Sequence, residues 1–330
     1  MTNQLTDKFN RKINYLRLSV TDRCDFRCLY CMSEKMTFLP RKELLTLEEL
    51  QRVGEIFISL GVNKIRITGG EPLVRKDIDQ LFNALGQNAH LKELTLTTNA
   101  SQLKSKAPML LESGVKRINI SLDSLDKDNF KKITRTGNLD QILENIRFAS
   151  GLGFEKIKLN SVLMKGTNDH EIFSLIDFAL ENQFDISFIE EMPLGHIEHE
   201  RGKTWIDNEQ SLKKIQSQYN LTRSALNTGG PAKYWHIDNS QTHIGFISPH
   251  SNNFCESCNR VRVSCKGELF LCLGQDEKIE LAPLLRKYPS NDEPIKRAIV
   301  NAMSIKPESH EFNLNEKQPA VIRFMSHTGG

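Results

Sequence analysis

Three cysteines lie within eight residues near the N-terminus, at Cys24, Cys28 and Cys31. Their spacing supplies three thiolates, whereas a closed tetrahedral zinc site needs four ligands. Thiolates also bind iron–sulfur clusters, and a cluster in which one iron lacks a protein ligand can bind a small molecule there and transfer an electron to it. The three cysteines therefore indicate an open iron–sulfur cluster and an enzyme. A structural zinc site completed by a distant ligand is the alternative.

A second group of thiols follows in the last third of the chain, at Cys255, Cys258 and Cys272. Cys265 falls between them, and residues 260–272 alternate as a β-hairpin around a Lys266-Gly267 turn. This hairpin puts Cys265 at its tip and Cys272 roughly 13 Å back along the strand, at about 3.3 Å per residue. We therefore expect a second open site with three ligands and Cys265 as a bystander. A closed site with four cysteines is the alternative.

Six strand-like segments alternate with helical segments and must position these cysteines. The strands are expected at 15–20, 64–68, 93–98, 117–122, 156–164 and 185–192. The clearest helix is expected at 46–60, where Thr46 and Glu49 fit a capping box and apolar residues recur with the helical period. Further helices are expected at 77–85, 139–150 and 171–182.

Alternating strands and helices predict an α/β fold with a parallel sheet and right-handed crossovers. Six such units predict an incomplete (βα)6 barrel, which is a partial TIM barrel rather than a closed one. We place a domain boundary near residue 220. Residues 1–220 are expected to form the core with the first cluster. Residues 221–330 are expected to form a smaller C-terminal α+β region with the second cluster.

The composition narrows the class of protein. The 330 residues include 44 basic and 41 acidic side chains, which argues against a nucleic-acid partner and leaves local arginines and lysines to meet any anionic substrate. No apolar stretch approaches membrane-spanning length and the first 15 residues are polar, so we expect a cytoplasmic protein without a membrane partner. Six of the seven cysteines lie in two tight groups, which favours metal binding over disulfides.

The sequence Gly69-Gly70-Glu71-Pro72 directly follows the strand expected at 64–68 and predicts a tight turn that brings the backbone close to a ligand. Together with the first three cysteines, it resembles the radical S-adenosylmethionine superfamily. The resemblance implies that these cysteines hold a 4Fe–4S cluster whose open iron binds S-adenosylmethionine. It also implies four contacts to this cofactor, from Tyr30, Gly70, Ser121 and Met192.

The second cysteine group is followed at once by Arg260-Val261-Arg262, and this pattern resembles the GTP 3′,8-cyclase family of molybdenum cofactor biosynthesis over essentially the whole chain. The resemblance implies a second 4Fe–4S cluster whose open iron binds the guanine of GTP. Arginine forks suit the triphosphate oxygens. The residues implied in GTP binding are Arg17, Arg66, Thr97, Lys158, Arg260, Val261 and Arg262.

The same resemblance implies the reaction. A 5′-deoxyadenosyl radical takes the hydrogen from C-3′ of GTP, and the product is (8S)-3′,8-cyclo-7,8-dihydroguanosine 5′-triphosphate. Transfer of one electron and one proton completes the reaction, and Arg260 and Arg262 are candidate proton donors. Gly329 and Gly330 are expected to reach the active site and to be needed for activity.

The partners implied are GTP as substrate, an electron donor, a downstream cyclic pyranopterin monophosphate synthase that receives the product, and a second copy of the chain in a homodimer. Two other functions remain open at this point. One is a two-cluster radical enzyme that acts on a peptide, and the other is a non-catalytic binding module stabilised by zinc.

Overall fold

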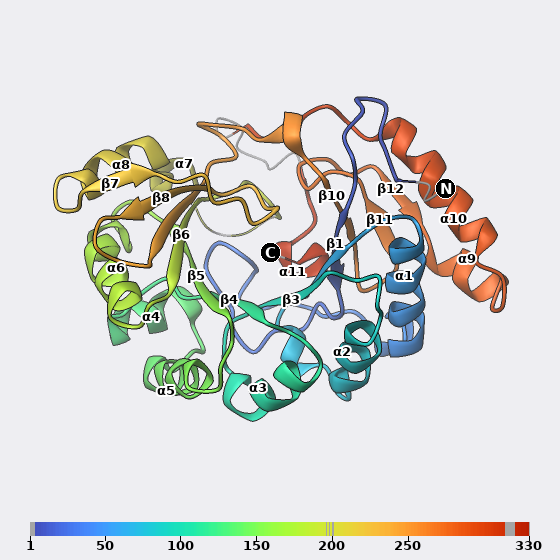
Figure 1. The fold of residues 1–330 in the computed structure, drawn as a ribbon, viewed down its shortest axis with the longest axis horizontal. Helices are drawn as coiled ribbons and strands as arrows, with labels where there is room; N and C mark the ends of the chain where they lie inside the picture. The colour runs from blue at the N-terminus through green and yellow to red at the C-terminus, as the bar shows by residue number, and fades with distance from the viewer. Residues whose placement is uncertain (1–3, 196, 198, 200, 314–320, 330) are drawn as a thin grey trace.

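The computed structural model describes residues 4–195, 197, 199, 201–313 and 321–329. One sheet of 12 strands runs through it, in the order β12-β11-β10-β1-β2-β3-β4-β5-β6-β9-β8-β7 (Figure 1). Within these residues, no helix combines the length and the apolar character needed to cross a bilayer.

Six neighbouring strands of this sheet are parallel and follow chain order. They are β1 (Tyr15–Ser19), β2 (Lys64–Thr68), β3 (Glu93–Thr98), β4 (Arg117–Ser121), β5 (Lys156–Leu163) and β6 (Asp185–Glu190). All six were expected from the sequence, because apolar residues alternate with polar ones along most of each strand. The α/β class with a largely parallel sheet is thereby confirmed.

Strands from the last third of the chain extend the sheet at both ends. At one end, β10 (Arg260–Val263) pairs in parallel with β1 and is followed by antiparallel β11 (Glu268–Phe270) and β12 (Lys278–Glu280). At the other end, β9 (His243–Ile247) pairs with β6 and is followed by β8 (Lys233–Ile237) and β7 (Leu221–Arg223). The predicted hairpin is confirmed as β10 and β11, with Gly267 in its turn at φ +82°.

Six helices connect the parallel strands and form an arc outside the sheet (Figure 1). They are α1 (Leu47–Ser59), α2 (Ile78–Gly86), α3 (Leu103–Glu112), α4 (Lys127–Thr134), α5 (Leu139–Ser150) and α6 (Ile172–Glu181). The capping box is confirmed, since the Glu49 N–H donates to Thr46 Oγ1 at 3.1 Å and the Thr46 N–H donates to the Glu49 carboxylate at 2.9 Å.

Two of these helices, α3 and α4, were not expected from the sequence. In α3, only Leu103, Ala107 and Leu110 are buried, and Pro108 interrupts the pattern of good helix formers. In α4, Phe130 and Ile133 are the buried apolar residues. A stripe of two or three apolar side chains is too sparse for periodicity to detect, so packing against the sheet decides these segments.

The remaining helices are short and mostly follow β6. The α-helices are α7 (Arg201–Thr204), α8 (Asn208–Gln216), α9 (Ala282–Lys287), α10 (Glu293–Ala302) and α11 (Met325–Thr328). The 3-10 helices are η1 (Arg41–Glu43), η2 (Pro72–Val74), η3 (Asp169–Glu171), η4 (Cys255–Ser257) and η5 (Met303–Ile305). Figure 1 shows α11 near the centre of the molecule, on the side of the sheet away from the arc of helices.

The two faces of the parallel strands differ in chemistry. In β1, Leu16 and Leu18 join the hydrophobic core, whereas Tyr15 and Arg17 line a cavity. Successive side chains in a strand point to opposite faces, so the same alternation in the neighbouring strands gives the sheet one apolar face and one polar face. The polar face positions the candidate site.

Candidate active site

The loop after β1 carries Cys24, Cys28 and Cys31, all partly buried. Burial raises the pKa of each of these thiols. Nearby negative charges, including those of the other cysteines, raise the pKa of Cys24 and Cys28 further. Three acidic groups that repel one another in a low-dielectric loop stay protonated unless a cation binds them. Their electrostatics therefore fit a ligand set for a positively charged iron centre.

The surroundings of these sulfurs also fit an iron–sulfur cluster. The Phe26 N–H donates to Cys24 Sγ at 3.4 Å, and the Asn99 amide lies 3.7 Å from the same sulfur. Such bonds to ligand sulfur are typical of cluster sites. Among the described residues, no three His, Cys, Asp or Glu side chains converge on one metal ion. That finding concerns single ions, since each thiolate of a 4Fe–4S cluster binds a different iron.

The Gly-Gly-Glu-Pro turn after β2 packs directly against the first cysteine loop. A Cβ on Gly69 would lie 2.6 Å from the Thr21 carbonyl oxygen, and one on Gly70 would lie 2.3 Å from the Arg23 carbonyl oxygen. Both contacts are with backbone, so only glycine fits. The Gly70 and Glu71 N–H groups donate to these same carbonyls at 2.8 Å. The turn thus fixes the strand end that leads to the first cysteine.

Glu71 is fully buried beside this loop. Its carboxylate accepts hydrogen bonds from the Leu73 N–H at 3.0 Å, the Thr98 hydroxyl at 2.8 Å and the Asn99 N–H at 2.7 Å. Burial nevertheless raises the pKa of Glu71 to about 7. A buried carboxylate with this pKa is suited to receive a small cationic group.

Of the other predicted cofactor residues, Tyr30 belongs to the first cysteine loop, whereas Ser121 and Met192 lie at or just after strand ends. The Tyr30 hydroxyl donates to Asp123 Oδ2 at 2.7 Å, and the Val162 N–H donates to Asp123 Oδ1 at 2.8 Å. Burial raises the pKa of Asp123 to about 6. Tyr30 is thereby held in one orientation beside the first cysteine loop. Ser121 ends β4, and Met192 follows β6 and lines the cavity.

Two rows of polar side chains cross β10, β1 and β2 on the face that lines the cavity. The strand register places Arg262, Arg17 and Arg66 side by side in one row. It places Arg260, Tyr15 and Lys64 in the row before it. The cavity is lined by all seven residues predicted for GTP, which are Arg17, Arg66, Thr97, Lys158, Arg260, Val261 and Arg262.

The two rows on β10, β1 and β2 together form the floor of the cavity. The positive charges of its arginines repel one another. Burial, together with the charges of Arg66 and Arg260, lowers the pKa of Arg17 to about 10. Burial and the charges of Arg17 and Arg260 lower the pKa of Arg262 well below its usual range. Buried like charges at short range are costly unless an anion neutralises them. A polyanion is therefore the ligand class that this floor fits.

Tyr15 lies within this floor and was not recognised from the sequence. Its hydroxyl accepts a hydrogen bond from Arg66 Nε at 2.6 Å. Burial alone would raise the pKa of Tyr15, but the charges of Arg66, Arg17, Lys64 and Arg260 lower it to about 7. Tyr15 and Lys64 could have been found from strand alternation, because each stands two residues before a predicted GTP-binding arginine on the same face.

The second cysteine group lies at one end of the cavity. Cys255, Cys258 and Cys272 all line it, and their charges act on one another. Cys265 is fully buried elsewhere, where its carbonyl accepts from the Leu45 N–H at 2.8 Å. The charged groups around its thiol are Asp22, Arg75 and Glu268. The structure thus separates Cys265 from the other three as expected from the hairpin, while the roles of all four remain predictions.

The C-terminal segment lies between the first cysteine loop and the cavity. Met325 lines the cavity, and the backbone of the neighbouring Ser326 opposes the rise that burial causes in the pKa of Cys31. Arg262 donates to the carbonyl of Gly329. Gly329 has φ +76°, and a Cβ there would lie 1.9 Å from Thr68 Oγ1. Gly330 lies outside the described residues.

The predicted residues therefore fall into two neighbouring groups. The seven GTP residues, the second cysteine group and Met192 share one cavity. The first cysteine group and Tyr30 lie in the loop after β1, where Tyr30 contacts Asp123, and Gly70 lies in the turn after β2. Tyr15, Lys64, Glu71 and Asp123 were not among the predicted site residues.

Comparison with known proteins identifies two regions of the chain. Residues 18–179 match the model described as Radical SAM superfamily, and residues 184–312 match the model described as Molybdenum Cofactor Synthesis C. The first region contains the first cysteine group, and the second region contains the other.

Curated relatives match the whole chain. A GTP 3′,8-cyclase of Ectopseudomonas mendocina (strain ymp) is 53% identical over 330 residues, which is 100% of this chain and 99% of the relative. A GTP 3′,8-cyclase 2 of Pseudomonas aeruginosa is 54% identical over 328 residues, which is 99% of each chain.

Among solved structures, Streptococcus suis SuiB bound to S-adenosylmethionine matches with a TM-score of 0.63 and 19% identity, over 97% of this chain and 79% of that chain. At this identity the likeness shows the fold alone. The family follows instead from the curated relatives, which share about half of their residues with this chain along its full length. By that measure the chain belongs to the GTP 3′,8-cyclase family of radical S-adenosylmethionine enzymes.

Proposed function

We propose that this enzyme converts GTP to (8S)-3′,8-cyclo-7,8-dihydroguanosine 5′-triphosphate, the first step of molybdenum cofactor biosynthesis. The observation that carries the proposal is the cationic floor of β10, β1 and β2, which meets Cys255, Cys258 and Cys272 in one cavity. A nucleoside triphosphate carries close to four negative charges, and guanidinium groups in a row can bind its phosphates with paired hydrogen bonds.

Cys24, Cys28 and Cys31 would hold one 4Fe–4S cluster, and Cys255, Cys258 and Cys272 would hold the second. When bound, the first cluster and S-adenosylmethionine supply the 5′-deoxyadenosyl radical that starts the reaction. The methionyl amino group is a cation that Glu71 is suited to receive, since the pKa of this buried carboxyl is raised to about 7 by burial. Tyr30, Gly70, Ser121 and Met192 complete the proposed cofactor contacts.

The chain's own residues bind and orient the substrate. Arg17, Arg66 and Lys158 would bind the triphosphate, and Thr97 lies within reach because Arg66 donates to its hydroxyl at 3.3 Å. Arg262 lines the cavity and also donates to the carbonyl of Gly329, so it lies between the substrate site and the C-terminal segment. This position supports Arg262 as donor of the proton that completes the reaction. Arg260 and Val261 line the same wall.

The C-terminal glycines complete the proposed site. Gly329 fits where a side chain would collide with Thr68, and its carbonyl is held by Arg262. A backbone segment without side chains at this point can exclude water while leaving room for two ligands. Gly330 would extend this segment.

Several broader features belong to the same proposal. The parallel strands would curve into a partial TIM barrel over residues 1–220, and residues 221–330 would form the part that carries the second cluster. The enzyme would work in the cytoplasm with an external electron donor, as a homodimer, and a cyclic pyranopterin monophosphate synthase would consume its product. Residues 221–330 add strands beside β1, which supports assigning the second cluster to this part of the chain.

The decisive experiment uses GTP deuterated at C-3′ with anaerobically reconstituted protein, dithionite and S-adenosylmethionine. The expected result is deuterium in 5′-deoxyadenosine, together with the cyclised triphosphate, only when GTP is present. A matched reaction uses GTP deuterated at C-2′, from which no deuterium should transfer. Deuterium-free 5′-deoxyadenosine from both substrates would contradict the proposal.

A further inference from the structure

Lys306 follows η5 and is buried, with only 1% of its surface exposed. Its ammonium group donates to the carbonyl of Leu271, and it lies 3.8 Å from Cys258 Sγ. A carbonyl oxygen carries only part of a charge and does not balance a buried cation. In the described part of the chain, no carboxylate forms an ion pair with Lys306.

A buried ammonium group without a counterion is strongly destabilising. The groups that can balance the positive charge of Lys306 are the thiolates of the second cysteine group. The nearest of these sulfurs is that of Cys258, which lies 3.8 Å from the ammonium group. The charge of Lys306 also acts on Cys255 and Cys272. Lys306 is therefore a cation that contacts one proposed ligand and acts electrostatically on the other two.

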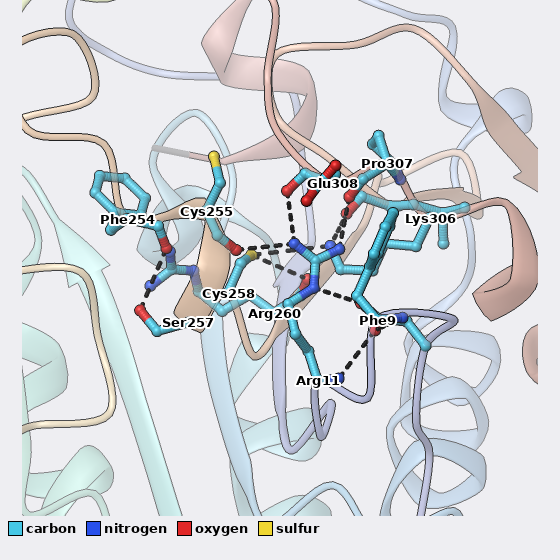
Figure 2. A network of polar contacts seen from close by, with 12 residues as sticks. Phe9, Arg11, Phe254, Cys255, Ser257, Cys258, Arg260, Lys306, Pro307 and Glu308 are labelled. Atoms are coloured by element: carbon cyan, nitrogen blue, oxygen red, sulfur yellow. Dashed lines mark hydrogen bonds and ion pairs between the residues drawn. The ribbon is translucent and has the colours of Figure 1, made fainter.

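Arg11 shows the contrasting arrangement in the same network, drawn in Figure 2. It is buried too, but Asp7 pairs with it at 2.6 Å and neutralises it. Arg11 then donates to the carbonyls of Cys255 at 2.8 Å, Glu308 at 2.7 Å and Pro307 at 2.6 Å. These bonds tie the segment that follows Lys306 to the first ligand of the group, so the ammonium group cannot easily move away.

We propose that Lys306 is the fixed countercharge of the second cluster and favours its reduced form. The inference rests on the proposed function, which assigns that cluster to Cys255, Cys258 and Cys272. Three thiolates around a 4Fe–4S core give a negative unit, and one-electron reduction adds a further negative charge. Net charge and contacts to the ligand sulfurs are among the main determinants of cluster potential. A cation beside one sulfur stabilises the more negative state.

The test measures the midpoint potential of the second cluster by EPR-monitored titration with dithionite. Every sample is the reconstituted full chain with Cys24→Ser, Cys28→Ser and Cys31→Ser, so that only the second cluster gives a signal. Lys306→Gln and Lys306→Met remove the charge, and Lys306→Arg keeps it. Lys287→Gln is the matched control, because it removes an exposed lysine charge from helix α9.

At a given potential, the ratio of reduced to oxidised cluster should be at least tenfold lower in the two neutral variants than in the parent. This corresponds to a midpoint potential that is lower by about 59 mV for a one-electron couple. Lys306→Arg and Lys287→Gln should stay close to the parent. Iron content is the second readout. Loss of iron from both neutral variants with retention in Lys306→Arg would also support a countercharge.

Two results would overturn the inference. One is equal potentials in Lys306→Gln, Lys306→Met and Lys287→Gln with full iron content. The other is loss of iron from Lys306→Arg as well, because this would show that the packing of the Lys306 side chain matters rather than its positive charge. If the parent itself held no cluster, the proposed function would fail first, and the iron assay would show this before any titration.

Discussion

Replacing Gly329 with alanine should uncouple the C-terminal segment from the active site without unfolding the protein. Gly329 has φ +76°, and a Cβ would lie 1.9 Å from Thr68 Oγ1 and 2.4 Å from Thr68 Cβ. Thr68 is 1% exposed at the end of β2 and cannot move away. The segment, which Arg262 holds through a carbonyl, must move instead.

The backbone strain alone sets a lower limit for the effect. The left-handed helical conformation costs a non-glycine residue about 1–2 kcal/mol, and Gly329, with φ +76° and ψ 131°, lies outside even that region, so this range is a minimum. If only the docked segment bears this strain, the ratio of docked to undocked segment falls by a factor of about 5 to 30. The collision with Thr68 adds to this, so we expect product formation to fall by roughly thirtyfold or more.

Gly166→Ala is the matched control for backbone strain. Gly166 has φ +70°, and a Cβ there would have no atom within 4 Å. This variant should lose about 1–2 kcal/mol of unfolding free energy but keep its turnover. Gly329→Ala should instead keep its unfolding free energy and its iron content. Urea denaturation and anaerobic product assays measure both, and a Gly329→Ala enzyme with more than half of normal turnover would refute the reasoning.

Three further predictions concern pH and metal content. The pKa of Tyr15 is lowered to about 7, so its contribution to stability is complete above pH 10 and is lost as the pH falls through 7. Tyr15→Phe should abolish this rise in stability, which reaches up to about 4 kcal/mol, in urea titrations between pH 7 and 10. The pKa of Glu71 is raised to about 7, so its contribution is complete below pH 4.5 and is lost as the pH rises through 7. Glu71→Gln should remove that decline, and an unchanged slope would contradict the assignment. Cys272→Ser should halve the iron content, whereas Cys265→Ser should leave it unchanged; equal iron in the two variants would show that the hairpin argument is wrong.

Local sequence patterns predicted much of the fold. The six parallel strands and the helices α1, α2, α5 and α6 each carry a complete apolar pattern over their length. The hairpin of β10 and β11 was found because Gly267 marks its turn. The helices α3 and α4 were missed, because only two or three apolar residues of each are buried and contacts with the sheet stabilise them.

The candidate site could be predicted where chemistry and spacing coincide in a short segment. The cysteine groups and the glycine turn are of this kind. Tyr15 was missed because a tyrosine in a strand is usually a packing residue, and its unusual environment arises only when β2 and β10 pair with β1 on its two sides. Lys306 gives no local signal at all, since its significance depends on a thiol 48 positions earlier in the chain.

The pairing of β10 with β1 also has a consequence for how the protein folds. Asn259 and Asn14, next to the paired strands, are joined by a hydrogen bond across 245 positions of sequence. Contacts between such distant segments form late, because their loop-closure entropy must be overcome first. This late step also brings Arg260 and Arg262 against Arg17, so it works against charge repulsion. An anion that binds the paired strands, such as pyrophosphate, would stabilise them by mass action. The triphosphate of the substrate would act in the same way and would therefore favour this last folding step.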